Sequence, residues 1–190
     1  MSTLPQHDDA RTAIVASLYI QALHQGQGLW FRVASASMHP TLRTGEAVWI
    51  EPATADEILP GEIIAFEAPG GLTTHRVLLR QLSNNTLHLL QTGDASIEAG
   101  WVSAQAVIGR VTSIRAHAGL VDLHCPFARR SGSVTACLRY LSYRTRKLPL
   151  LGLALRKCSR ICIRFGDHCI RSRPTASTAH DPVYSVDQHI

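Results

Sequence analysis

The chain has 190 residues, of which 45% are hydrophobic and 17% are charged, and its formal net charge is +5. A chain of this size can bury a substantial core, and this composition is typical of folded proteins, so an intrinsically disordered chain is excluded. All five cysteines lie after residue 124. An odd number confined to one end argues against a disulfide framework and favours a reducing compartment for that half.

The first segment, residues 1–28, is predicted to contain a short amphipathic helix. Residues 1–9 are polar, and between residues 10 and 23 apolar side chains recur at three- and four-residue spacings. About four turns are too short to span a bilayer, which needs about 20 apolar residues. The basic start and small-residue cleavage site of a signal peptide are not found. We therefore expect neither a transmembrane helix nor a signal peptide. The helix is expected either to pack on the β core or to lie at a membrane interface.

The second segment, residues 29–124, is predicted to form a small β domain. Short runs with alternating apolar and polar residues are bounded by glycine, proline and asparagine, which is typical of antiparallel strands. Asn84 and Asn85 are predicted to form the two-residue turn of a hairpin. The expected fold class is therefore mainly β (α+β), with a curled antiparallel sheet. The predicted strands are residues 29–35, 46–51, 62–67, 73–82, 86–91, 105–114 and 120–123.

Three stretches of this segment contain a candidate Ser–His–Asp constellation. A serine hydroxyl such as that of Ser37 needs a neighbouring base to act as a nucleophile, and His75 and Asp94 follow it in the chain. Strand alternation places His75 on the apolar side, where burial favours its neutral form, whereas Arg76 points away and is assigned a structural role. The order of the residues alone does not establish a triad, because triads are recognised by geometry.

The motifs around these residues resemble those of type I signal peptidases. The likeness covers roughly residues 30 to 115 and implies the curled β domain shared by signal peptidases and repressor-type self-cleaving peptidases. The branch it resembles is that of the archaeal and eukaryotic-type enzymes, which use His where most bacterial enzymes use Lys. Five stretches of this chain carry the likeness: SASMHPTL (35–42), LPGEIIAF (59–66), THRV (74–77), TGDA (92–95) and VIGRV (107–111). The family patterns that they resemble are S-x-S-M-x-P-T-L, L-x-x-G-D-I-V-x-F, T-H-R-V, K-G-D-N and G-K-V, in that order.

The resemblance implies a role for each matching residue. Ser37 would be the nucleophile, and His75 would be its general base and then the acid for the leaving amine. Asp94 would orient His75 and stabilise its imidazolium, with Glu98 as a second candidate for the supporting acid. The hydroxyl of Ser35 and the backbone N–H of Ser37 would bind the oxyanion. Neither a cofactor nor a metal ion is implied.

The chain departs from the family pattern in three respects. Glu46 and Glu62 stand where the family has Asp, and both are interpreted as turn residues. Ala95 and Ser96 replace the usual Asn pair next to the predicted acid. The N-terminal membrane anchor of the family is also missing.

The implied function is that of a serine endopeptidase that cleaves leader or signal segments, with a precursor peptide as its partner. The expected location is cytoplasmic or peripheral to a membrane. One alternative is a catalytically inactive β domain that binds peptides or membranes. Another is a repressor-type self-cleaving peptidase, but the roughly 34 residues before Ser35 are too few for the DNA-binding domain that such a protein needs.

The third segment, residues 125–173, is strongly basic, and residues 174–190 are expected to be a disordered tail. From residue 129 to 173 there are twelve Lys or Arg and one acid, interleaved with apolar residues. This pattern predicts two basic amphipathic helices broken at Pro149. An anionic membrane surface is the predicted partner, and the alternative is a solvated basic face on helices packed against the β domain. If the segment is only an anchor, removing residues 129–190 should spare catalysis.

Two other uses of the third segment are not expected. No nucleic-acid-binding module accompanies the basic residues, so nucleic acid is not a predicted partner. The spacing of Cys158, Cys162, His168 and Cys169 matches no zinc pattern, so no metal site is predicted there.

Overall fold

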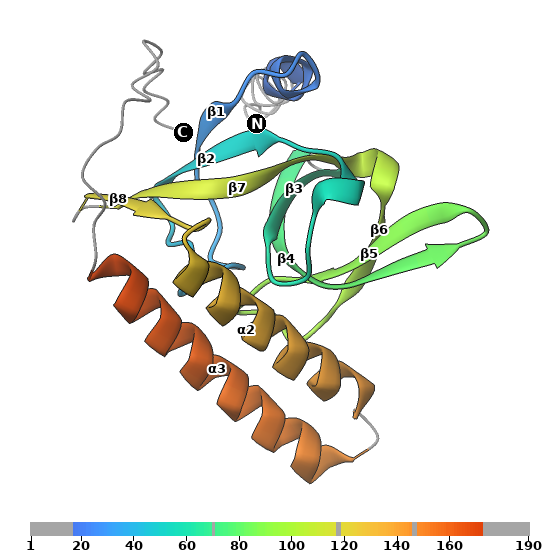
Figure 1. Ribbon diagram of the computed structural model, residues 1–190, viewed down its shortest axis with the longest axis vertical. Coiled ribbons are helices and arrows are strands. Elements are labelled where there is room, and N and C mark those ends of the chain that lie inside the picture. Colours follow the sequence, from blue (N-terminus) through green and yellow to red (C-terminus); the bar gives the residue numbers. More distant parts are fainter. Residues whose placement is uncertain (1–16, 70, 117–118, 146–147, 173–190) are drawn as a thin grey trace, which may run out of the picture.

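The computed structural model describes residues 17–69, 71–116, 119–145 and 148–172, and these residues form an α+β fold (Figure 1). Eight strands within them form one antiparallel sheet in the order β1-β2-β7-β3-β4-β5-β6, with β8 paired to β7. The sheet is curled but not closed, which confirms the predicted fold class. The strands are β1 (Leu29–Arg32), β2 (Ala47–Pro52), β3 (Ile63–Ala68), β4 (Gly71–Ser83), β5 (Thr86–Thr92), β6 (Gly100–Ser103), β7 (Val107–Ala116) and β8 (Gly119–Asp122).

The predicted strands are found with local differences. Asn84 and Asn85 have φ values of 48° and 59°, as a tight hairpin turn between β4 and β5 requires. Strand β6 was not predicted. The next strand starts at Val107 instead of residue 105, because the Ser103 side chain accepts a hydrogen bond from the Gln105 N–H and caps a short 3₁₀ helix (Ala104–Ala106).

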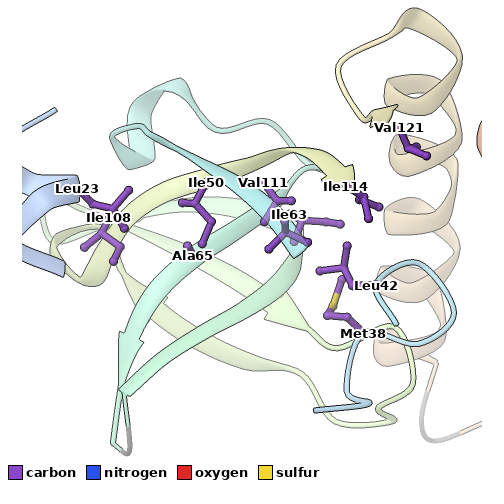
Figure 2. Packing of buried hydrophobic residues seen from close by; sticks show 11 residues of the cluster. Leu23, Met38, Leu42, Ile50, Ile63, Ala65, Ile108, Val111, Ile114 and Val121 are labelled. Carbon is purple, nitrogen blue, oxygen red and sulfur yellow. The ribbon is translucent and has the colours of Figure 1, made fainter. Parts of the chain in front are cut away.

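The main hydrophobic core lies inside the curl of the sheet, and the chain that follows β1 contributes to it (Figure 2). Met38 and Leu42 come from the turn between β1 and β2 and are buried beside Ile114 and Ile63. Leu23 joins the same core from the helical residues 17–24. The described part of the predicted first helix therefore packs on the sheet.

Two helices follow the sheet, as predicted. Helix α2 (Pro126–Arg144) and helix α3 (Pro149–Arg171) lie side by side, with α2 between α3 and the sheet (Figure 1). Pro149 stands in the first turn of α3, where its fixed φ suits a helix start. The helices touch at small residues: the Ser142 hydroxyl of α2 donates to the Gly152 carbonyl of α3 at 3.2 Å.

Helix α2 approaches the sheet closely at a pair of glycines. Gly61, before β3, has a φ of +102°, and a Cβ on it would lie 2.5 Å from the backbone of Gly132 in α2. Ala136 of α2 is buried with Leu78 and Leu90 of the sheet. No helix among the described residues has the length and apolar character needed to cross a membrane. The predicted polar start, the first half of the predicted first helix and the predicted tail lie outside the described residues.

Candidate active site

Ser37 lies half-buried in the turn between β1 and β2, and its neighbours fix its position. Met38 and Leu42 are one helical turn apart, joined by a 3.1 Å bond from the Leu42 N–H to the Met38 carbonyl, and both are buried in the core. The Ser37 carbonyl accepts a hydrogen bond from the Ala95 N–H at 2.8 Å. Its hydroxyl lies 3.3 Å from that of Ser35. The predicted nucleophile is therefore held by the core on one side and by the loop after β5 on the other.

His75 lies on β4, and its ring is oriented by a residue that the sequence analysis missed. Its Nδ1 atom lies 2.6 Å from Oε1 of Gln91 on the neighbouring strand β5. An amide oxygen only accepts hydrogen bonds, so Nδ1 carries the hydrogen and Nε2 keeps its lone pair. This tautomer is the one that a general base acting through Nε2 needs.

Gly93 brings the Ser37 turn and the His75 ring together. A Cβ on this residue would lie 2.5 Å from the Ser37 carbonyl oxygen and 3.2 Å from Nε2 of His75. Only a residue without a side chain can fit between them. Gly93 thus lies next to the Ser37 carbonyl and next to the His75 nitrogen that Gln91 leaves free, while the Ser37 hydroxyl is paired with that of Ser35.

The surroundings of His75 keep its ring neutral. Burial lowers the pKa of His75 below its ordinary value of 6.5, and the positive charge of Arg139 acts in the same direction. The hydrogen bond to Gln91 and the negative charge of Asp94 oppose the decrease in pKa without outweighing it. At neutral pH the imidazole is therefore in the form that accepts a proton.

Asp94 is buried and is bound by residues other than His75. Arg76 donates from Nε to Oδ1 at 2.8 Å and from Nη2 to Oδ2 at 2.6 Å, and the Thr41 hydroxyl donates to Oδ2 at 2.6 Å. Burial alone would raise the pKa of Asp94, but the charge and hydrogen bonds of Arg76, together with the Thr41 bond, hold that pKa below its ordinary value of 3.8. The carboxylate is therefore charged and joins β4 to the turn that contains Ser37.

This geometry corrects the expectation that Asp94 orients His75. Across the β4–β5 ladder Arg76 pairs with Thr92, so Asp94, two residues further on, projects on the side of Arg76. His75 and Gln91 project on the opposite side. Asp94 therefore acts on His75 only through its charge, and Gln91 occupies the position at Nδ1. Arg76 points away from His75, as predicted.

The remaining predicted residues have local contacts, and Glu46 also has a distant partner in Arg171. Glu98 is exposed, and its hydrogen bonds to Thr92 and Ser96 are made by its backbone. Glu46 and Glu62 each accept a hydrogen bond from the backbone N–H three residues before, at 2.9 Å, as expected for turn residues. Among the described residues, no group of His, Cys, Asp or Glu side chains is placed to hold a metal ion.

The two helices hold the loops of the site, which the sequence did not indicate. Arg139 of α2 donates to the carbonyls of Gly93 and Asp94, both at 2.8 Å, and also contacts the Ser96 carbonyl. Arg171 of α3 donates a hydrogen bond to Thr41, in the turn that contains Ser37. Because α2 supports the loop behind Ser37 and His75, the condition attached to the predicted dispensability of residues 129–190, that they serve only as an anchor, is not met.

Arg171 ties the end of α3 to the turn that follows Ser37. It donates to the Thr41 carbonyl at 2.9 Å and to both oxygens of Glu46, at 2.6 and 3.0 Å. Asp167, one turn earlier in α3, contacts Arg171 and accepts from Arg43 at 2.8 Å. Nothing in the sequence around residue 171 distinguishes this arginine from the other cations of the segment.

A groove lies beside Ser37. Its cavity of about 140 Å³ lies between residues 31–35, which lead into the Ser37 turn, and residues 72–74, which lead to His75; the buried Val48 and Ile50 also line it. Strand β5 pairs with β4 only from Arg76 onward, so in the described sheet the residues of β4 before Arg76 are paired with β3 alone. No described strand pairs with their other edge.

Comparison with known protein families and with functionally characterised proteins gave no match for this chain.

Proposed function

We propose that this chain is a serine endopeptidase of the signal peptidase type that cleaves leader or signal segments of precursor proteins. The observation that carries the proposal is the arrangement around Gly93: the Ser37 turn and Nε2 of His75 meet at this residue, while Gln91 holds Nδ1. Ser37, the proposed nucleophile, lines the groove, and the proposed base His75 directly follows the groove residues 72–74 and is held by Gln91.

In the proposed mechanism, Ser37 Oγ attacks the carbonyl carbon of the scissile peptide bond while its proton passes to Nε2 of His75. The Ser35 hydroxyl and the Ser37 N–H stabilise the oxyanion that forms. The tetrahedral intermediate collapses, the C–N bond breaks, and His75 gives its proton to the leaving amine. Water then attacks the acyl-enzyme by the same route and releases a carboxylic acid and free Ser37.

The groove supports a specific mode of substrate binding. An extended leader segment would add to the edge of β4 before Arg76 by backbone hydrogen bonds, which is β-augmentation. The cavity of about 140 Å³, lined by Val48 and Ile50, has room for small apolar side chains next to the cleaved bond. This agrees with the small-residue preference that the resemblance implies.

The first prediction concerns the nucleophile. An alkyl fluorophosphonate probe, which reacts with activated serines, should label the wild-type protein at Ser37, because His75 removes the hydroxyl proton. Ser37→Ala should fold normally and lose essentially all labelling and peptide cleavage, since a nucleophile and its base act as a unit. Labelling is measured by intact-protein and peptide mass spectrometry, which needs no known substrate.

Ser83→Ala is the matched control, because Ser83 is an exposed serine at the far end of β4. This variant should react at the wild-type rate. If the wild-type protein does not react, or if Ser37→Ala is labelled as fast as the wild type, the chain is instead a non-catalytic β domain.

A further inference from the structure

The outer side of the α2–α3 hairpin exposes apolar side chains that the fold does not use. In α3, Leu150, Ile161 and Phe165 are 83%, 66% and 64% exposed. At 3.6 residues per turn these three positions fall within about 60° of one another around the helix. In α2, the exposed Val134 and Leu141 form a second stripe.

Both stripes turn away from the β sheet. Helix α2 faces the sheet with Gly132 and Arg139, which lie about 150° around the helix from the Val134–Leu141 stripe. Helix α3 faces inward with the buried Ile163, which lies about 140–160° around the helix from Leu150, Ile161 and Phe165. Each stripe therefore lies on the side of its helix that faces away from the sheet, and we call the two stripes together the outer face.

The outer face is bordered by cations on both helices. Lys157 and Arg164 are exposed next to the α3 stripe, and Arg130 and Arg144 are exposed next to the α2 stripe. The only acid in residues 126–172 is Asp167. Its side chain is 10% exposed and is paired with Arg43 and Arg171, so it does not offset the border charge.

We propose that the outer face is a docking surface for an anionic phospholipid membrane, with the apolar stripes in the interface and the cations on lipid phosphates. An apolar stripe between cations is the arrangement by which amphipathic helices lie on anionic bilayers without spanning them. A second copy docked face to face would place like charges together. A nucleic acid would leave Ile161 and Phe165 in water. This inference does not depend on the proposed peptidase activity.

Vesicle sedimentation of the full chain tests the proposal. At low salt the wild-type protein should sediment with vesicles of phosphatidylcholine containing about one third phosphatidylserine, and little with phosphatidylcholine alone. Raising the salt to about 0.5 M should release it, because screening shortens the range of the attraction. Failure to bind anionic vesicles at low salt, or equal binding to both kinds of vesicle, would overturn the proposal.

Two pairs of variants localise the binding surface. Ile161→Glu/Phe165→Glu should weaken the partition to anionic vesicles at least about tenfold, since it places charge where apolar side chains enter the interface. Its control, Leu82→Glu, changes an equally exposed leucine on β4 and should bind like the wild type. Lys157→Gln/Arg164→Gln should weaken binding about 25-fold, at roughly fivefold for each cation. Arg80→Gln is its control.

The charge variants keep the proposal testable if the apolar variant does not fold, because Lys157 and Arg164 are exposed and lie outside the helix contacts. Circular dichroism checks the fold of each variant. Wild-type binding by both outer-face variants would overturn the proposal. A second result would also overturn it: the protein does not bind vesicles but forms a concentration-dependent dimer, and Ile161→Glu/Phe165→Glu abolishes that dimer. The outer face would then be the contact surface for a second copy of the chain.

Discussion

Gln91 determines which nitrogen of His75 can accept a proton, and it also influences the pKa of the ring. Its amide oxygen accepts a hydrogen bond from Nδ1–H. Because the amide is neutral, it stabilises the protonated imidazolium less than a carboxylate in the same place would. Burial therefore dominates and the pKa of His75 stays below 6.5. With a neutral orienting group, the buried imidazole stays unprotonated, and so able to accept a proton, down to a lower pH than it would with a charged group.

Gln91→Glu should therefore shift the acid limb of the reaction to higher pH. In the wild type, the rate of fluorophosphonate labelling should rise with pH with a midpoint below 6.5, because the neutral His75 is the reactive form. A carboxylate at Nδ1 stabilises the imidazolium, raises the pKa of His75 and moves the midpoint up. The measurement is the pH profile of the labelling rate.

Gln81→Glu supplies the control, since Gln81 is exposed on the same strand as His75 and should leave the profile unchanged. An unchanged midpoint in Gln91→Glu would show that Gln91 does not orient the base. A midpoint well above 6.5 in the wild type would contradict the burial effect on His75.

The residues that could be predicted from the sequence are those with local signals. Ser37 precedes Met38 in a recognisable motif, and the alternation of β4 gave the side on which His75 lies. Uninterrupted pairing from the turn at Asn84 and Asn85 would place Asp94 opposite His75. A register shift between Val77 and Leu79 moves the pairing by one residue, so that Gln91 lies with His75 and Asp94 lies with Arg76. The partner of His75 could not be predicted, because nothing in the sequence marks this register shift and the family resemblance also assigns Asp94 to the histidine.

At the scale of elements, the site depends on how α2 meets the sheet. Gly132 lies against Gly61. The Gly61 carbonyl accepts a hydrogen bond from Nη1 of Arg76 at 2.7 Å, and Arg76 is also the residue that is ion-paired with Asp94. The contact between α2 and the sheet is therefore linked to this ion pair through Arg76. One turn beyond Ala136, Arg139 binds the loop that contains Gly93. The depth at which α2 sits thus sets the position of the loop behind the Ser37 turn.

Two glycine-to-alanine changes in the helices should have opposite effects on stability. In Gly132→Ala the new Cβ would lie 2.7 Å from the Gly61 carbonyl oxygen, so backbone must move and the free energy of unfolding should fall by about 1–3 kcal/mol. In Gly152→Ala the nearest atom is at 3.5 Å, an ordinary contact, and the better helix propensity of alanine should raise the free energy of unfolding by about 0.5–1 kcal/mol.

Urea unfolding followed by circular dichroism measures both changes. Because the two substitutions are chemically identical and both lie in helices, the pair separates close packing from helix propensity. Equal effects of Gly132→Ala and Gly152→Ala would show that α2 does not approach the sheet as closely as the structure indicates.

The elements themselves were easier to predict than their packing. Alternating runs and turn residues identified most strands, and Pro149 marked the boundary between the two helices. Strand β6 was not predicted, because its four residues follow a turn and are too few to show an alternating pattern. The contact of α2 with the sheet could not be predicted, because Gly61 and Gly132 are distant in the sequence and neither indicates the other.

In the whole molecule, ion pairs fasten α3 to the turn after Ser37, and this makes the assembly sensitive to acid. Burial alone would raise the pKa of Glu46, but the hydrogen bonds and charges of Arg171 and Arg43 hold it below its ordinary value of 4.5. A carboxyl group with a lowered pKa stabilises the folded state above its unfolded pKa, and that stabilisation is lost as the pH falls through the folded value. Asp94 behaves in the same way relative to its ordinary value of 3.8.

The buried His75 acts in the same direction at higher pH. Because its pKa is lowered in the folded state, the unfolded chain binds more protons just below pH 6.5, and acidification there favours unfolding. The wild-type unfolding temperature should therefore begin to fall below about pH 6.5 and fall more steeply below about pH 4.5, as Glu46 and then Asp94 are protonated.

Glu46→Gln should remove one component of this acid sensitivity. At pH 7 the variant should be less stable by about 1–3 kcal/mol, because Arg171 and Arg43 lose a charged partner that is nearly buried. The deficit relative to the wild type should shrink as the pH falls from 5 to 3, since protonation of Glu46 removes the same charge from the wild type. Glu98→Gln, which changes an exposed carboxylate, should follow the wild-type profile. Thermal unfolding between pH 3 and 7 measures all three proteins, and a deficit in Glu46→Gln that stays constant with pH would contradict the coupling of α3 docking to this carboxylate.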